Sequence, residues 1–230
     1  KGSNGVVLVT TKQNKEKSSI PLTITSKRET SNEYFVEAPQ TIQSNDKNVS
    51  VSFKETDLNA KYEYQSIPSL SENVFLIGKI VDWYKAEFID GEANVYLENS
   101  FVGKSSIDTK QFKDTLEISF GADNNISIKR ERLTEFTENQ LIGPNRKETL
   151  AFKITVRNNK SYPITTKIID QIPVSTTKEI QVDTIDLSGG VLEKDSGKVV
   201  WEIGLNSNES KELVIKYSVK YPKTKKVIIE

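Results

Sequence analysis

The stretch "ETLAFKITVRNNKSYPITTKIID" (residues 148–170) decides the fold class. Its first half places alternate apolar side chains on one face: Leu150, Phe152, Ile154 and Val156. A period of two is typical of a strand that is half-buried in an antiparallel sheet. The Asn-Asn pair that follows tolerates the positive φ of a turn, and Pro163 begins the next apolar run, where its missing N–H is harmless. The stretch therefore predicts two β-strands joined by a turn.

The same pattern recurs along the rest of the chain, and no stretch shows a sustained helical period. The clearest further runs are "VSVSF" (49–53), "NVFLIGKIVDW" (73–83), "ANVYLE" (93–98), "ISIKRERLTEF" (126–136), "KVVWEIGL" (198–205) and "KELVIKYSVKYP" (211–222). Turn signals rich in Gly, Asn and Asp separate these runs, as in β-sandwich proteins. We expect an all-β fold of antiparallel β-sandwich architecture.

A polar segment, "TENQLIGPNRKE" (137–148), offers the best domain boundary because it contains the Gly143-Pro144 break. It predicts a first β-sandwich over residues 33–140 and a second, immunoglobulin-like sandwich over 141–230. The strand at 126–136 is long for one small sandwich, so an alternative is that both sandwiches share one continuous sheet through it. Residues 13–32 are expected to form a polar linker after a terminal strand at 1–12. The lack of any Met indicates a start codon upstream.

The alternation also predicts the cores. In the first sandwich we expect to find buried Val49, Val51, Phe53, Phe75, Ile77, Ile80, Val95, Leu97, Leu116, Ile118 and Ile126. In the second we expect Leu150, Phe152, Ile154, Val156, Ile168, Trp201, Ile203, Leu213, Ile215 and Tyr217. Trp201 lies in line with Val199 and Ile203, which favours a role as a core anchor.

The composition excludes several chemistries. The chain has no Cys and no His, so zinc sites built on thiolate or imidazole, and nucleophilic mechanisms that need Cys–His or Ser–His–Asp groups, are impossible. The 32 basic and 32 acidic side chains balance, which gives no charge argument for nucleic acid. No apolar run is long enough for a membrane-spanning helix. We expect no cofactor and no bound metal.

Carboxylates are the remaining acid–base groups. The candidates are Asp90 with Glu92, Asp123, and Asp170, each expected in or beside a turn, and nothing in the sequence brings two of them together. We therefore assign no catalytic residue and expect the chain not to be an enzyme. Two short Asp-Thr-aliphatic patterns, at 114–116 and 183–185, match an acceptor pattern for bacterial O-glycosylation, with Thr115 and Thr184 as the acceptors.

Several motifs, in order and spacing, resemble the C-terminal domain of the mucoidy inhibitor A-like family, which is the domain of unknown function numbered 4139. They are Gly91-Glu92-Ala93, "FVGKS" (101–105), "SFGADNN" (119–125), "RNNKSYPI" (157–164), "DQIPVS" (170–175) and Tyr221-Pro222. The resemblance implies association with the bacterial cell envelope, in the periplasm or at the outer membrane, and supplies no reaction. Separately, "KGSNGVVLVTTK" (1–12) resembles the last strand of the plug domain of TonB-dependent receptors.

Together these observations favour a non-catalytic interaction or scaffold module of a larger envelope protein, with a protein or glycan partner. Edge-strand pairing is the expected binding mode. The alternative is a carbohydrate-binding or carbohydrate-active domain that uses loop carboxylates and exposed aromatic side chains such as Trp83, Tyr84 and Tyr162.

Overall fold

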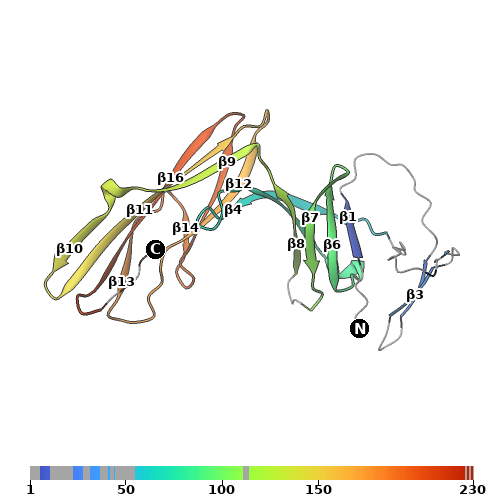
Figure 1. The fold of residues 1–230 in the computed structure, drawn as a ribbon, viewed down its shortest axis with the longest axis horizontal. Helices are drawn as coiled ribbons and strands as arrows, with labels where there is room; N and C mark the ends of the chain where they lie inside the picture. The colour runs from blue at the N-terminus through green and yellow to red at the C-terminus, as the bar shows by residue number, and fades with distance from the viewer. Residues whose placement is uncertain are drawn as a thin grey trace. The chain divides into compact units, whose positions relative to one another are not determined.

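The structure is a computed structural model that describes residues 55–110 and 114–225, residues 41, 44, 227 and 229, and the backbone of three strands before residue 37 (Figure 1). The fold is all-β, which confirms the predicted class. Within the described residues, two short 3-10 turns accompany the strands, η1 (Trp83–Ala86) and η2 (Thr134–Phe136). The predicted core positions Val49, Val51 and Phe53 lie outside the described residues.

The chain forms two compact units, one from residues 1–61 and 79–120 and the other from residues 62–78 and 121–230. None of the three boundaries between these segments falls at residues 140–141, where the sequence pattern predicts one. The difference arises because β9, inside the expected first sandwich, pairs with β11 from Phe152↔Arg132 to Asn158↔Ile126 and so belongs to the second unit. Pairing between strands far apart in sequence leaves no local signal.

In the first unit, a three-stranded sheet has the order β1-β6-β7. Its strands are β1 (Val6–Thr10), β6 (Gly91–Leu97) and β7 (Ser100–Ile107). Strand β1 runs parallel to β6, with Val7 opposite Ala93 and Val9 opposite Val95. The strand that was expected to end another module therefore pairs within this chain.

A second small sheet joins β2 (Thr23–Lys27) to β3 (Asn32–Val36) in antiparallel register. Strand β2 lies inside the segment 13–32 that was expected to be a linker, and the other residues of that segment, Asn32 apart, lie outside the described part of the chain. The points at which the chain passes between the two units fall inside three strands, β4 (Ala60–Ser66), β5 (Phe75–Val81) and β8 (Thr115–Ala122).

The second unit is a sandwich. One sheet has the order β10-β11-β16-β13, with β9 also paired to β11. Its strands are β9 (Ile126–Arg132), β10 (Glu138–Ile142), β11 (Asn145–Asn158), β13 (Gln181–Asp186) and β16 (Ser210–Pro222). The other sheet has the order β14-β15-β12-β4 and continues into β5 and β8. Its remaining strands are β12 (Ile164–Gln171), β14 (Val191–Glu193) and β15 (Lys198–Leu205).

The two sheets of the second unit enclose one hydrophobic core. Nine of the positions predicted for it are buried: Leu150, Phe152, Ile154, Val156, Ile168, Trp201, Leu213, Ile215 and Tyr217. Ile203 is partly buried. Trp201 is the expected anchor, and its indole N–H donates to the carbonyl of Leu187 at 2.7 Å. Of the described positions predicted for the first sandwich, Ile80, Val95 and Ile118 are buried, and Phe75, Ile77, Leu97 and Leu116 are partly buried. Ile126 is also buried, but in the core of the second unit, because β9 belongs to that unit.

Candidate functional site

The predicted acid–base carboxylates do not come together as a pair, because each one is engaged separately. Asp90 accepts hydrogen bonds from the backbone N–H of Thr109 at 2.6 Å and from its hydroxyl at 2.5 Å. The hydroxyl bond is the main cause that lowers the pKa of Asp90. Glu92 instead forms an ion pair with Lys104 at 2.7 Å. Although Asp90 directly precedes β6 and Glu92 lies in it, the two carboxylates therefore do not form a shared site.

Asp170 lies in strand β12 rather than in a turn, and it is almost completely buried. Its carboxylate accepts a hydrogen bond from Nε of Arg130 at 2.7 Å and one from the backbone N–H of Gln171 at 2.8 Å. The Arg130 guanidinium also lies 3.7 Å from the centroid of the Phe152 ring. A buried carboxylate with these partners is a structural ion pair.

Asp123 pairs with Lys160, and this pair joins two turns that are separate in the sequence. The Lys160 ammonium lies 2.5 Å from the Asp123 carboxylate, and both side chains are mostly buried, at 12% and 16% exposed. The turns also meet through their backbones, since the N–H of Asn159 donates to the carbonyl of Asn125 at 2.8 Å. The pair is thus held in place by the backbone around it.

Lys160 also organises two tyrosines. Its ammonium donates to the Tyr162 hydroxyl at 3.1 Å and lies 5.2 Å from the centroid of the Tyr162 ring and 5.4 Å from that of Tyr64. Burial acts to lower the pKa of Lys160, but the hydrogen bonds to Asp123 and the tyrosines outweigh it and raise that pKa. Burial is also the largest cause of the raised pKa of Tyr64.

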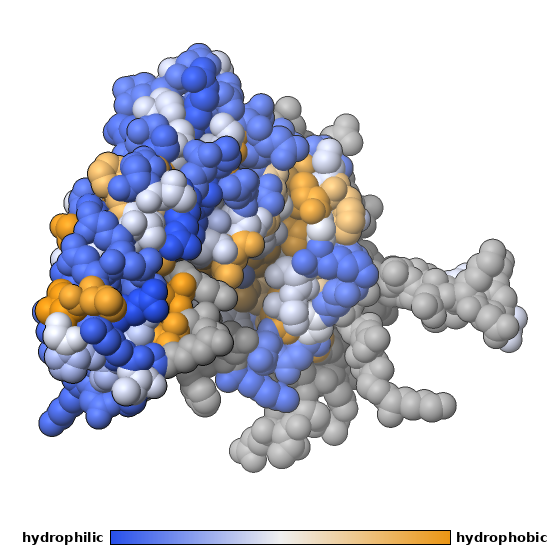
Figure 2. Space-filling view, turned by 60° about the vertical axis from the view of Figure 1, so that its left-hand side comes forward, coloured by the Kyte–Doolittle hydropathy of each residue, from blue (hydrophilic) through white to orange (hydrophobic). Residues whose placement is uncertain are grey.

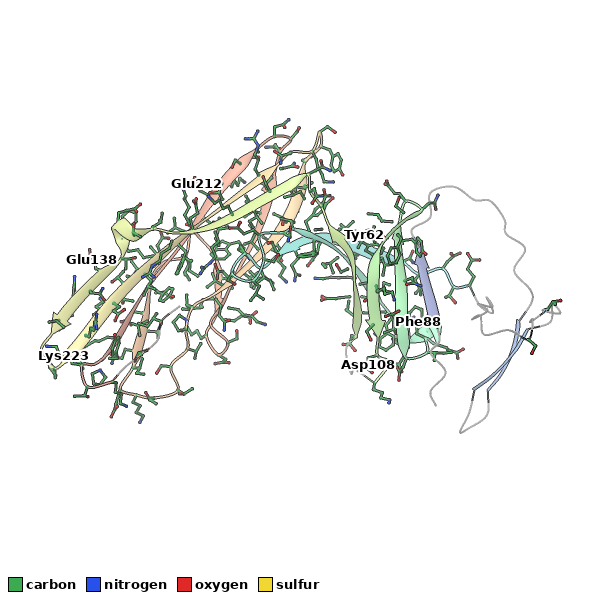
Figure 3. The ribbon with its side chains drawn as sticks, viewed as in Figure 1. Tyr62, Phe88, Asp108, Glu138, Glu212 and Lys223 are labelled. Atoms are coloured by element: carbon green, nitrogen blue, oxygen red, sulfur yellow. The ribbon has the colours of Figure 1, made fainter. Side chains whose placement is uncertain are left out.

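Beside this cluster lies an open groove of about 420 Å³ in the second unit. Strands β4 and β12 run parallel but pair only from Tyr64↔Thr166 to Ser66↔Ile168. The groove lies where the two strands begin, and its lining includes Tyr62, Tyr64, Tyr162, Thr165, Lys167 and Glu202. Figure 3 labels Tyr62 at this end of β4.

The aromatic side chains proposed for glycan contact fall in different places. Trp83 is buried in η1 and Tyr84 is exposed beside it, both in the first unit. Tyr162 alone of the three lines the groove. Tyr62 and Tyr64 were missed, although "KYEYQ" places them two residues apart, on one face of a strand.

A second candidate site is the edge formed by β10. All five of its residues are exposed, and the exposed fraction reaches 72% for Leu141 and 44% for Ile142. Strand β10 pairs with β11 from Glu138↔Thr149 to Ile142↔Asn145. The turn between them is held at Pro144, whose carbonyl accepts from the N–H of Lys223 at 3.0 Å. Figure 3 shows Glu138 and Lys223 near the two ends of β10.

Two further kinds of feature are absent from the part of the chain that the structure describes. No group of three or more acidic side chains there could hold a metal ion. No helix there is long and apolar enough to cross a membrane. Thr184 is exposed on β13, and Thr115 is half-buried at the start of β8, so O-glycosylation at these residues stays a prediction.

Comparison with known proteins gives a family and one relative. The family described as a domain of unknown function, DUF4139, matches residues 6–223. The chain is also similar to Protein F37C4.5 of Caenorhabditis elegans, with 22% identity over 211 residues, 86% of this chain and 38% of that protein. The chain therefore corresponds to well under half of that relative. Because the family match begins within β1 and ends just after β16, nearly the whole chain is a member of the DUF4139 family.

Proposed function

We propose that this chain is a non-catalytic interaction module, and that strand β10 binds an extended segment of a partner protein by adding it to the sheet. The observation that carries the proposal is that all five residues of β10 are exposed at a sheet edge. An edge strand presents backbone N–H and C=O groups that can pair with another chain, and partner peptides use this mode widely.

The other described edges of the second unit are better protected than β10. Strand β9, which continues the same edge, carries the exposed charges Lys129, Glu131 and Arg132. Strand β13 has a register shift between Thr184 and Asp186, and β14 is three residues long. Charged side chains, bulges and short strands each discourage pairing with a further strand.

Strand β10 lacks these protections. Its one ionisable side chain, Glu138, accepts a hydrogen bond from Gln140 of the same strand at 2.9 Å. The next two residues are the exposed Leu141 and Ile142, which point to opposite faces of the sheet. An incoming strand with apolar residues could therefore bury side chains on both faces while its backbone pairs with β10.

The face seen in Figure 2 supports an edge rather than a flat apolar face as the binding surface. On the face seen in Figure 2, hydrophilic residues predominate and hydrophobic ones form small separate groups. A face-to-face interface would need a larger continuous apolar patch. The separate engagement of Asp90, Asp123 and Asp170 supports a non-catalytic role.

The test is site-specific crosslinking in the native host. A photoreactive phenylalanine analogue replaces Leu141 in the full chain, and a matched control carries it at Thr184, which is exposed on the protected edge β13. We expect a partner adduct from position 141 and none from position 184. A synthetic peptide from the crosslinked partner segment should bind the unmodified chain. The Leu141→Lys variant should bind it at least about tenfold more weakly, the loss typical of an important contact residue.

Three outcomes would overturn this proposal. They are the absence of an adduct at position 141, equal adducts at both positions, and an adduct made only with a second copy of the chain. The free energy of unfolding of Leu141→Lys should stay within about 0.5 kcal/mol of the original, as is usual for an exposed position. That control separates weaker binding from loss of fold.

We also propose that the chain acts in the bacterial cell envelope, as its resemblance to the mucoidy inhibitor A-like family implies. The similarity to a nematode protein is a reason to test this directly. Fractionation of the native host with an antibody against the chain should recover it with the envelope. Recovery in the cytosolic fraction would contradict this setting.

A further inference from the structure

The groove between the starts of β4 and β12 has the features of a ligand site that is separate from the β10 edge. Two of its tyrosines, Tyr62 and Tyr162, are about half-exposed, at 50% and 51% of the residue surface. Tyr62 comes from β4, and Tyr162 comes from the turn before β12. Two rings from different elements therefore stand at one groove.

Tyr162 is held in place before any ligand arrives. Its hydroxyl accepts a hydrogen bond from Lys160, which is itself anchored by Asp123 in a mostly buried ion pair. A ring that is already ordered loses less conformational entropy on binding than a mobile one. The Asp123–Lys160 pair thus preorganises one wall of the groove.

The charges at the groove argue against charged ligands. Glu63 and Glu202 are among the residues that line it, together with Lys167. Lys167 and Glu202 are also directly opposite each other in the β12–β15 register. A polyanion such as a nucleic acid needs a positively charged groove, and this one carries more acidic than basic groups.

A cationic ligand is disfavoured as well, although rings and carboxylates together can bind cations. Lys160 already places its ammonium 5.2 Å and 5.4 Å from the centroids of the Tyr162 and Tyr64 rings. The negative faces of these rings therefore interact with a cation of the protein itself. A second cation would have to share them at short range with a like charge.

A neutral polyhydroxyl ligand suits a groove whose lining mixes tyrosines with polar residues. Sugar hydroxyls both donate and accept, so they can pair with the carboxylate of Glu202, the ammonium of Lys167 and the hydroxyl of Thr165. The apolar C–H face of a sugar ring can lie against a tyrosine ring, which is a rigid and amphipathic contact surface. We propose that this groove is a binding site for a neutral oligosaccharide, with Tyr62 and Tyr162 as the stacking residues.

The experiment measures saccharide binding to the full chain. Three neutral oligosaccharides, maltohexaose, cellohexaose and chitohexaose, are titrated to millimolar concentration and followed by NMR shifts of backbone amides. We expect at least one of them to produce saturable shifts centred on Tyr62, Tyr162 and Thr165. The Tyr162→Ala variant should weaken that binding at least about tenfold, whereas Tyr162→Phe, which keeps the ring, should retain most of it.

The matched control is Tyr84→Ala, since Tyr84 is an exposed tyrosine of the first unit that lies outside the groove. This variant should bind the saccharide as the unchanged chain does. The absence of saturable binding by all three saccharides would overturn the proposal. So would equal weakening by Tyr84→Ala, or shifts caused by tetramethylammonium or heparin in place of a neutral saccharide.

Thermal unfolding of Tyr162→Ala checks that the variant is folded. As a second check, the backbone amide shifts near Ile154, a core residue that does not line the groove, should match those of the unchanged chain. The Leu141→Lys variant should leave saccharide binding unchanged because β10 does not line the groove. Failure of the groove proposal and failure of the β10 proposal are therefore distinguishable.

Discussion

Arg130 and Asp170 join the two sheets of the second unit by a buried hydrogen-bonded ion pair, with Nε of Arg130 2.7 Å from a carboxylate oxygen of Asp170. Arg130 belongs to β9 in one sheet, and Asp170 belongs to β12 in the other. The side chain of Asp170 is 1% exposed, so it has little access to water. Removal of either partner would leave a buried charge without its counterpart.

The first prediction concerns this pair. Arg130→Leu should lower the free energy of unfolding by about 3 kcal/mol, because breaking a buried pair from one side leaves an uncompensated charge. The double variant Arg130→Leu with Asp170→Leu should recover most of that loss. Urea unfolding at pH 7 measures both.

A matched control lies on the same strand, where Lys129 and Glu131 form an exposed ion pair at 2.7 Å. The variant Lys129→Ala should change the free energy of unfolding by less than about 1 kcal/mol, as exposed pairs usually do. Equal losses for Arg130→Leu and Lys129→Ala would contradict the role given to burial.

The second prediction concerns the pH dependence of the Asp123–Lys160 pair. Burial acts to raise the pKa of Asp123, but the hydrogen bonds from Lys160 and from the N–H of Asn125 outweigh it and lower that pKa below 3.8. A carboxyl whose pKa is lower in the folded state stabilises the fold above its unfolded pKa. This stabilisation is lost as the pH falls through the folded value.

The Asp123→Asn variant should therefore be less stable than the original by about 2 kcal/mol at pH 7, below the range for a fully buried pair. The difference in the free energy of unfolding between Asp123→Asn and the original should narrow as the pH falls below 3.8. It should persist at pH 9, because the pKa of Lys160 is raised and the ammonium stays charged there. Urea unfolding across this pH series measures it, and a constant difference would refute the assignment.

The sequence predicted strands and their buried faces better than it predicted their neighbours. The alternation of Leu150, Phe152, Ile154 and Val156 is a local property, and all four are buried. The parallel pairing of β4 with β12 joins residues about one hundred positions apart, as in the bond from the Thr166 hydroxyl to the carbonyl of Tyr64. The pairing of such distant strands depends on which strands pack around the same core. A local sequence pattern does not contain that information.

The candidate groove shows the same limit. The sequence predicts Tyr162 to be an exposed aromatic residue, and the structure places it at the groove. Its neighbours Tyr62 and Tyr64 come from β4, which is not among the strands predicted from the sequence. The partnership of Asp123 with Lys160 likewise depends on two turns that meet only in the folded chain.

The third prediction compares two glycines. A Cβ added at Gly190 would lie 2.5 Å from Nε1 of Trp201 and 2.7 Å from Cγ1 of Val199, whereas one added at Gly204 would meet nothing within 4 Å. Gly190→Ala must displace the buried indole and should lower the free energy of unfolding by about 1–3 kcal/mol. The tryptophan fluorescence spectrum of the Gly190→Ala variant should shift as well.

Gly204→Ala should leave the free energy of unfolding unchanged or raise it by about 0.5 kcal/mol, because alanine restricts the unfolded chain more than glycine does. Urea unfolding of both variants measures the contrast. A Gly190→Ala variant as stable as the original would show that the indole can move at no cost.

The last prediction concerns Asn158, whose side chain is completely buried at the end of β11. Its amide nitrogen donates to the carbonyls of Tyr162 at 2.9 Å, Asn206 at 3.0 Å and Leu205 at 3.3 Å. Its amide oxygen accepts from the N–H of Lys160 at 3.0 Å. One side chain therefore satisfies the backbone of the turn that holds both Lys160 and Tyr162.

Asn158→Ala should lower the free energy of unfolding by about 3 kcal/mol, since it leaves several buried polar groups without partners. Asn158→Asp has the same shape but cannot donate when ionised, so at pH 7 it should be at least as damaging. Burial would raise the pKa of the introduced carboxyl. A group whose folded pKa is raised destabilises the fold above its unfolded pKa, so the stability of Asn158→Asp should recover toward that of the original as the pH falls.

The neighbouring Asn159, which is exposed, provides the control, and Asn159→Ala should change the free energy of unfolding by less than about 1 kcal/mol. Urea unfolding of the three variants at pH 7 and pH 4 separates the effects. If Asn158→Asp matched the original at pH 7, the donor role of the Asn158 amide would be wrong. The organisation of the turn around Tyr162 would then need another cause.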